Sequence, residues 1–243
     1  MTHTNRDGVA CVWEHNGNDT MLYAVDYPGT FTRGTSLQEA VEKMKKEIPA
    51  YCTWAGIPMA EMADILVVQD VSCDLKVRDA DSDVLFEQER VPLLEEEYLR
   101  LKSLALRSAT DFLALYEAIP DKDRSSRPHR TTFYGAVPRT AEEMYRHTKN
   151  VNAYYFGEIG IDADNEGSIL DCRRRGFDAL EQQKDFLKNP VIEGSYGELW
   201  SLRKMLRRFL WHDRIHAKAM YRMAITLFGM ERIPDIFYFG GVI

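Results

Sequence analysis

The stretch that decides the fold is residues 203–216, which read Arg-Lys-Met-Leu-Arg-Arg-Phe-Leu-Trp-His-Asp-Arg-Ile-His. Its apolar residues recur at the three- and four-residue spacing of one helix face, and His212 and His216 fall on that same face. Side chains four residues apart stack one turn above the other, so two imidazoles here can share one metal ion. We therefore expect a long helix with both histidines directed inward.

The limits of this helix and its second face also follow from the sequence. Ser195 and Glu198 form a capping box that predicts its start, and Gly229 predicts its end. Two nearby arginines, Arg208 and Arg214, are candidates for the rim of a site that attracts an anionic substrate. The side opposite the histidines carries basic residues that we interpret as a solvated stripe: Arg203, Arg207, Arg214 and Lys218.

A third histidine lies on the apolar stripe of an earlier helix. Thr140 and Glu143 form another capping box, and His147 follows Met144 at helical spacing. Three of the six histidines are thus expected to face a helical interior. Together, His147, His212 and His216 are the predicted metal ligands.

Composition places the chain among globular proteins of the cytoplasm. The 243 residues, 45% of them hydrophobic, suffice for one large domain or two small ones. The four cysteines are scattered without a C-x-x-C pair, which favours reduced thiols over a disulfide framework. Residues 1–8 contain no apolar signal region, and no apolar run approaches the length of a membrane span. We therefore expect a cytoplasmic protein without a membrane contact.

The net charge of −7 is unevenly distributed along the chain. Residues 1–92 contain 8 basic and 16 acidic side chains, a balance of −8, whereas the remaining residues contain 23 basic and 22 acidic ones. An acidic first third argues against nucleic-acid binding there. Nucleic acid is therefore not an expected partner.

Hydrophobic periodicity changes near residue 91 from about two to about 3.6, which predicts two domains, 1–91 and 92–243. The first is expected to be an α+β unit, a small sheet covered on one face by one helix between Ser36 and about Trp54. The second is expected to be an all-α antiparallel four-helix bundle. The expected strands are 9–14, 21–27, 31–33, 65–71 and 84–86, and the expected bundle helices are 92–119, one from residue 141, 168–187 and 195–228.

Three imidazoles on facing helices would leave an open metal position for water or substrate, as in reactive metal sites. Imidazole suits several transition metals, of which we expect zinc or nickel. The bound ion would lower the pKa of a water or thiol. Tyr154 and Glu158 are candidates to support the ligands. A protease is the weaker alternative, because Asp213 stands where the H-E-x-x-H motif has Glu.

The segment ending in His212-Asp-Arg-Ile-His216, together with His147 on an earlier helix, resembles the DinB-like superfamily of four-helix bundles. The resemblance covers about residues 92–230. In that family one histidine comes from the second helix and an H-x-x-x-H pair from the fourth, which correspond here to His147, His212 and His216. The superfamily includes S-transferases and isomerases that use low-molecular-weight thiols, so the resemblance implies a thiol as cosubstrate.

The first domain resembles the HicB family over two segments. These are Tyr23-Ala-Val-Asp-Tyr-Pro-Gly29 and Thr32-Arg-Gly-Thr-Ser-Leu-Gln-Glu39-Ala-Val. That family supplies antitoxin partners, but no DNA-binding extension follows the strands here. The resemblance implies a module that binds a protein or a ligand.

Two functions from different classes follow from the sequence. The first is a cytoplasmic metal-binding DinB-like protein, a metal-dependent transferase that activates a small thiol or water and acts on a small electrophile. The alternative is a non-catalytic interaction module, with a structural metal or an empty histidine triad, that binds a protein partner through its N-terminal domain. A homodimer is compatible with either function.

Overall fold

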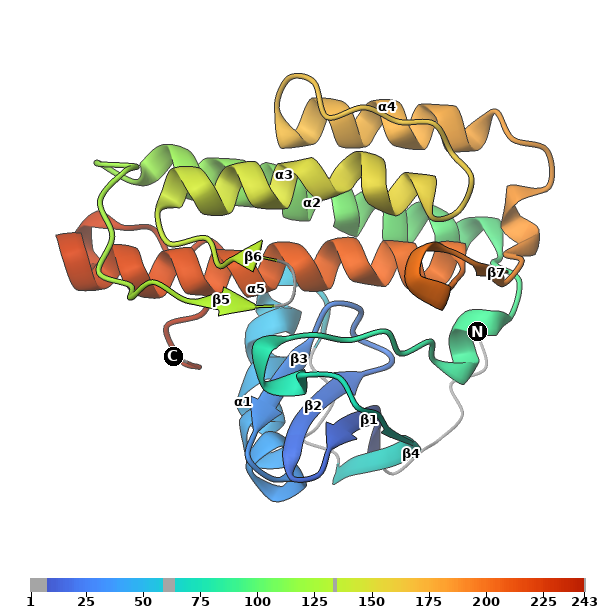
Figure 1. Cartoon of the computed structure of the whole chain (residues 1–243), viewed down its shortest axis with the longest axis horizontal. Helices are drawn as coiled ribbons and strands as arrows, with labels where there is room; N and C mark the ends of the chain where they lie inside the picture. Colours follow the sequence, from blue (N-terminus) through green and yellow to red (C-terminus); the bar gives the residue numbers. More distant parts are fainter. Residues whose placement is uncertain (1–7, 59–63, 133–134, 243) are drawn as a thin grey trace.

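The computed structural model describes residues 8–58, 64–132 and 135–242. Within them, a small mixed sheet with one helix comes first and helices follow, as the sequence predicts. Figure 1 shows the long helix α5 lying between the other C-terminal helices on one side and the sheet with α1 on the other. No helix of the described part is long and apolar enough to span a bilayer. The segment expected to contain no secretory signal, residues 1–8, lies outside the described residues except for residue 8.

The sheet has four strands in the order β3-β2-β1-β4. Strand β1 (Gly8–Asn16) pairs antiparallel with β2 (Asp19–Ala24), which pairs antiparallel with β3 (Phe31–Gly34). Strand β4 (Asp64–Ser72) pairs parallel with β1, and a register shift at Cys11 and Val12 marks a bulge. A tight turn between Asn16 and Asp19 joins β1 to β2.

Helix α1 (Leu37–Ala55) covers one face of this sheet. Its start and end agree with the prediction, because Ser36 accepts a hydrogen bond from the backbone N–H of Glu39 and Gly56 adopts the left-handed conformation. Alternate strand residues face the helix, among them Cys11 and Leu22. The intervening residues pack against Trp211 of α5. Strands β1–β3 are therefore covered on both faces, so the expectation of one covered face was wrong for them, whereas β4 is largely exposed.

The remaining helices are α2 (Glu95–Ala118), α3 (Ala141–Gly157), α4 (Ile169–Glu181) and α5 (Leu202–Phe228). Helix α2 packs on α5, α4 and α3, and α3 packs on α5 and α4. The described residues also form short strands and 3₁₀ turns: η1 (Val77–Asp79), η2 (Glu87–Arg90), β5 (Thr131–Thr132), β6 (Gly135–Ala136), η3 (Phe186–Lys188), β7 (Ile192–Glu193), η4 (Ser195–Gly197), β8 (Leu199–Trp200) and η5 (Met230–Arg232).

Two predicted helix boundaries and one predicted strand were wrong. The long helix begins after Ser201, whose hydroxyl accepts from the N–H of Lys204, and not after Ser195. Ser195 instead starts a 3₁₀ turn inside the β7–β8 hairpin, and its N–H donates to Glu158. Residues 84–86 are buried but form no strand, and α4 ends at Glu181, six residues before the predicted end.

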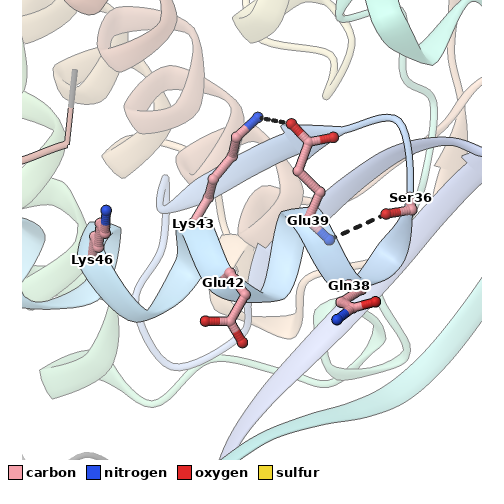
Figure 2. A pocket seen from close by; sticks show the side chains of 6 residues that line it. All are labelled: Ser36, Gln38, Glu39, Glu42, Lys43 and Lys46. Carbon is pink, nitrogen blue, oxygen red and sulfur yellow. Dashed lines mark hydrogen bonds and ion pairs between the residues drawn. The ribbon is translucent and has the colours of Figure 1, made fainter.

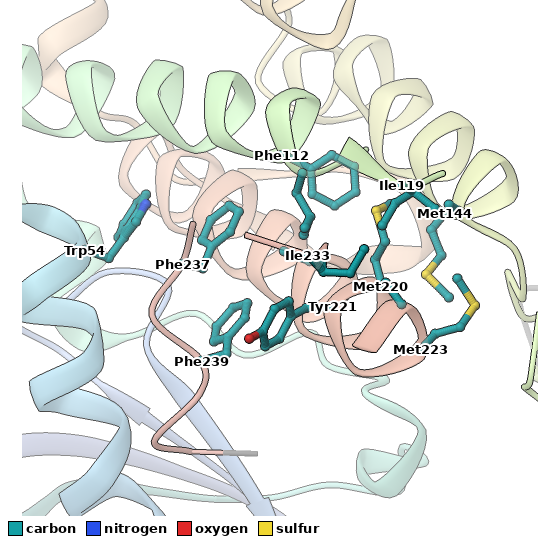
Figure 3. Packing of buried hydrophobic residues seen from close by; sticks show 14 of the residues in the cluster. Trp54, Phe112, Ile119, Met144, Met220, Tyr221, Met223, Ile233, Phe237 and Phe239 are labelled. Carbon is teal, nitrogen blue, oxygen red and sulfur yellow. The ribbon is translucent and has the colours of Figure 1, made fainter. Parts of the chain in front are cut away.

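The hydrophobic core does not divide at residue 91. One cluster joins Tyr51 and Trp54 of α1 to residues of α2, α3 and α5, and Trp54 stacks on Phe237 at 5.5 Å between ring centroids (Figure 3). Another joins the sheet to Trp211. The hydrophobic clusters are therefore continuous across residue 91, and the domain boundary itself stays a prediction.

Buried ion pairs join α5 to the N-terminal unit. Arg207 Nε lies 2.5 Å from Glu89 Oε1, and both side chains are almost fully buried. Arg214 and Lys218 donate to the two carboxylate oxygens of Glu47 at 2.7 and 2.5 Å. Because Glu47 is only 1% exposed and Arg214 is 0% exposed, this face of α5 is an internal interface. The interpretation of these residues as a solvated stripe was wrong.

Candidate metal centre

The three predicted ligands converge where α3 passes α5. Each of His147, His212 and His216 offers one ring nitrogen, and these nitrogens all lie within 4.8 Å of one another. The ring centroids are 4.6–5.0 Å apart. The Thr140 capping box fixes the start of α3, and helical spacing aligns the two α5 histidines. The triad is therefore close enough to hold one metal ion.

The distance between two of the nitrogens matches shared coordination. His147 Nε2 and His212 Nε2 lie 3.2 Å apart. Two nitrogens bound tetrahedrally to one zinc ion at about 2.0–2.1 Å would lie about 3.3–3.4 Å apart. A three-histidine donor set also suits zinc or nickel better than a hard, oxygen-seeking cation. On geometry and donor chemistry, the residues present fit a transition metal.

The environment keeps the imidazoles neutral, as metal binding requires. Partial desolvation by the surrounding protein lowers the pKa of His147. Burial, followed by the neighbouring His216 and His147, holds the pKa of His212 well below its ordinary value. Burial and then His147 do the same for His216. Three unprotonated rings at neutral pH are therefore available as ligands.

The site is partly open, and this differs from the prediction. His212 is 8% exposed and His216 is half-buried, but His147 is exposed and does not face a closed interior. Among the described residues the group contains three ligand side chains and no fourth. A site with three protein ligands and an exposed side leaves room for water or substrate.

Asp213 is buried and is not placed to act as the general base that a zinc protease needs. Its two carboxylate oxygens accept hydrogen bonds from Arg173 of α4 at 2.5 and 3.1 Å, and both side chains are 0% exposed. A carboxylate held in a bidentate pair is not free to accept a proton from a metal-bound water. This arrangement speaks against the protease alternative.

The other residues expected near the site have different roles. Arg214 pairs with Glu47, and Arg208 is buried against Trp211 and donates to the carbonyl of Ser82. Neither arginine lies at an open rim. Glu158 accepts from the Ser195 N–H and so holds the β7–β8 hairpin.

The ring contacts of Tyr154 are with Tyr155 and Trp200. The residue next to it is the one that reaches the site, since the Tyr155 ring lies 6.0 Å from that of His212. In the sequence Tyr155 looks like any apolar-face residue of this helix, so no motif singles it out. A second residue near the site that no sequence motif marks is Arg127, in the loop between α2 and α3. It donates to the carbonyl of Ala219, one turn beyond His216.

A pocket of about 550 Å³ lies elsewhere, along the first turns of α1. Figure 2 shows its polar groups pairing with one another: Glu39 binds Lys43, and Ser36 caps the helix. No residue of the pocket belongs to α3 or α5. It therefore offers no route to the histidines. Its lining residues are Ser36, Gln38, Glu39, Glu42, Lys43 and Lys46.

Comparison with known proteins identified no relative: no family model, no curated protein and no solved structure matches the chain significantly.

Proposed function

We propose that the chain is a metal-binding DinB-like protein of the cytoplasm, in which helices α2–α5 form an antiparallel four-helix bundle. His147, His212 and His216 hold a divalent transition metal ion, zinc or nickel. The activity is a transferase reaction in which the metal activates a small thiol that attacks an electrophile. Water is the alternative nucleophile at the same site. The observation that carries this proposal is the convergence of three imidazole nitrogens within 4.8 Å.

The chemistry expected of such a site divides between the ion and the chain. A bound ion lowers the pKa of a thiol or water at neutral pH. His212 and His216 would hold it from consecutive turns of one rigid helix, and His147 would hold it from α3. The exposed side of His147 gives a thiol access, and Tyr155 packs beside His212 and shields its inner edge from water.

Metal content tests this proposal directly. The purified protein, stripped with a chelator and dialysed against zinc or nickel, should contain about one ion per chain by elemental analysis. His212→Ala should lose most of that metal and keep its helical circular dichroism, because apolar faces and not the metal hold helices of this length. The matched control is His129→Ala, which removes an exposed loop histidine.

A second measurement addresses the thiol. The cobalt-substituted protein should change its visible spectrum when a small thiol such as 2-mercaptoethanol is added, since thiolate coordination alters the ligand field. Full metal occupancy in His212→Ala would contradict the ligand assignment. Unfolding of the same variant would indicate a structural metal and weaken the proposal of catalysis.

One observation favours the alternative of an interaction module. Strand β4 lies at the edge of the sheet, and Leu66, Val67 and Val68 are each 39–41% exposed. An exposed apolar edge strand is a template for an added strand from a protein partner. If the wild-type protein binds neither zinc nor nickel, the triad holds no metal and this second function is the better one.

A further inference from the structure

Positive charge gathers beside His216 from separate parts of the chain. Arg127, from the segment between α2 and α3, donates through Nη1 to the carbonyl of Ala219 at 3.5 Å, three residues after His216 on α5. Arg222 lies three residues after Ala219 on α5, so these two residues share one side of the helix. The loop and the helix therefore bring two guanidinium groups to the turns that follow the triad.

Strand β3 adds a third guanidinium from the other side. The Phe31 ring lies 6.1 Å from Trp211 and 6.0 Å from Lys218 Nζ, so β3 runs beside the segment of α5 that carries the histidines. Arg33 is two residues after Phe31 and shares its face of the strand. Thr32, between them, faces α1 and donates to the carbonyl of Ala40.

The fourth arginine is Arg130, which is held next to Arg33 by η1. Arg33 Nη1 donates to the carbonyl of Arg78 at 3.1 Å, and Arg130 Nη1 lies 3.0 Å from the carboxylate of the next residue, Asp79. Adjacent residues of η1 thus hold both arginines.

The four positive charges influence one another. After burial, the charges of Arg130 and Arg222 lower the pKa of both Arg33 and Arg127. Among the described residues, the ion pair that these four arginines make is Arg130–Asp79.

Arg33 and Arg127 differ from the buried arginines of α5 in their partners. Arg207 and Arg214 each have a buried carboxylate partner within the chain. Arg33 and Arg127 are half-buried, and in the described part of the chain their guanidinium groups donate hydrogen bonds only to backbone carbonyls. A divalent ion at the triad would add further positive charge to this place. An anion between these groups would relieve the repulsion.

We propose that Arg33 and Arg127 bind a carboxylate or phosphate group of the substrate whose reacting atom lies at the triad. Guanidinium groups match both anions through paired hydrogen bonds. Arg130 and Arg222 add attraction at longer range. The identification of this anion as part of a substrate rests on the proposed metal-dependent function, whereas the anion site itself does not.

The test uses the metal-free protein, so that its result is independent of the metal. Succinate and inorganic phosphate are titrated separately by calorimetry, and the tighter ligand identifies the preferred anion. Arg33→Gln and Arg127→Gln should each weaken binding about tenfold, the effect expected for one charge-assisted hydrogen bond. Arg33→Lys should bind with intermediate affinity, because lysine keeps the positive charge but lacks the paired N–H donors of the guanidinium group. The control is Arg100→Gln, an exposed arginine of α2, and circular dichroism establishes that each variant is folded.

Three outcomes would overturn the proposal: no binding of either anion to the wild type, unchanged affinity in both glutamine variants, or equal weakening in Arg100→Gln. Arginine-dependent anion binding by a protein that binds neither zinc nor nickel would support the anion site and contradict the metal-dependent function. Metal binding that does not depend on these arginines, in a protein that binds neither anion, would support the metal-dependent function and contradict the anion site.

Discussion

Replacing Glu47 by glutamine should strongly destabilise the protein, because it leaves a buried positive charge without a partner. Glu47 on α1 accepts from Arg214 and Lys218 of α5 at 2.7 and 2.5 Å. Arg214 is fully buried, and its Nε and Nη1 atoms already lack partners among the described residues. Glutamine keeps the shape of the side chain and removes the charge, so the remaining penalty is electrostatic.

Removal of one member of a buried ion pair costs about 3–5 kcal/mol. For a chain of this length, 1 kcal/mol corresponds to roughly 2–4 °C in Tm, so the expected fall in Tm is roughly 6–20 °C. Urea unfolding followed by tryptophan fluorescence and circular dichroism measures the loss of free energy. The control is Glu42→Gln on the same helix, whose exposed pair with Lys45 should contribute no more than about 1 kcal/mol.

The same pair predicts a pH dependence. Burial raises the pKa of Glu47, but Arg214 and Lys218 outweigh it and leave the pKa below its ordinary value of 4.5. The unfolded chain therefore takes up this proton first as the pH falls. The stabilisation is complete above about pH 4.5 and is lost below it as the pH approaches the folded-state pKa. Wild type should lose stability in that range more steeply than Glu47→Gln. A loss in Glu47→Gln no larger than that in Glu42→Gln would refute the buried interface.

Two further substitutions check other parts of the structure. Asp213→Asn should lower the free energy of unfolding by about 3–5 kcal/mol, since Arg173 stays buried and charged, and should leave metal content by elemental analysis unchanged; loss of metal with normal stability would instead make Asp213 part of the site. Ser201→Ala should cost about 1 kcal/mol in urea unfolding as the N-cap of α5, whereas Ser195→Ala should change stability by less than about 0.5 kcal/mol; the reverse order would restore the capping box predicted at Ser195.

Local signals in the sequence predicted the elements that are stabilised locally. Ser36 and Thr140 cap their helices as predicted, because each hydroxyl and its N–H partner are three residues apart in the chain. The histidine triad was predictable for a similar reason: helical periodicity places His212, His216 and His147 on defined faces. Only the packing of α3 on α5 was needed to bring them together.

Long-range partners explain the predictions that failed. Arg207 and Arg214 have the pattern of a solvated stripe, and nothing nearby in sequence indicates that Glu89 and Glu47 bury them. The Ser195–Glu198 box has the right residues, but the β7–β8 hairpin places Glu198 beside Lys204. Competition by distant groups for the same side chain is not visible in a local pattern.

The packing of α5 against the sheet and α1 also has a consequence for the order in which the chain can fold during synthesis. Tyr51 and Trp54 join their cluster only when residues such as Leu210 are present, and Phe237 follows later still. At roughly 5–20 residues per second, about 160 further residues take roughly 8–30 s. During that interval the sheet and α1 are complete in sequence but expose the apolar surfaces that α5 later covers. Closing these distant contacts is intrinsically slow. A nascent chain that stalls before residue 202 would therefore present an aggregation-prone apolar surface and become a substrate for chaperones.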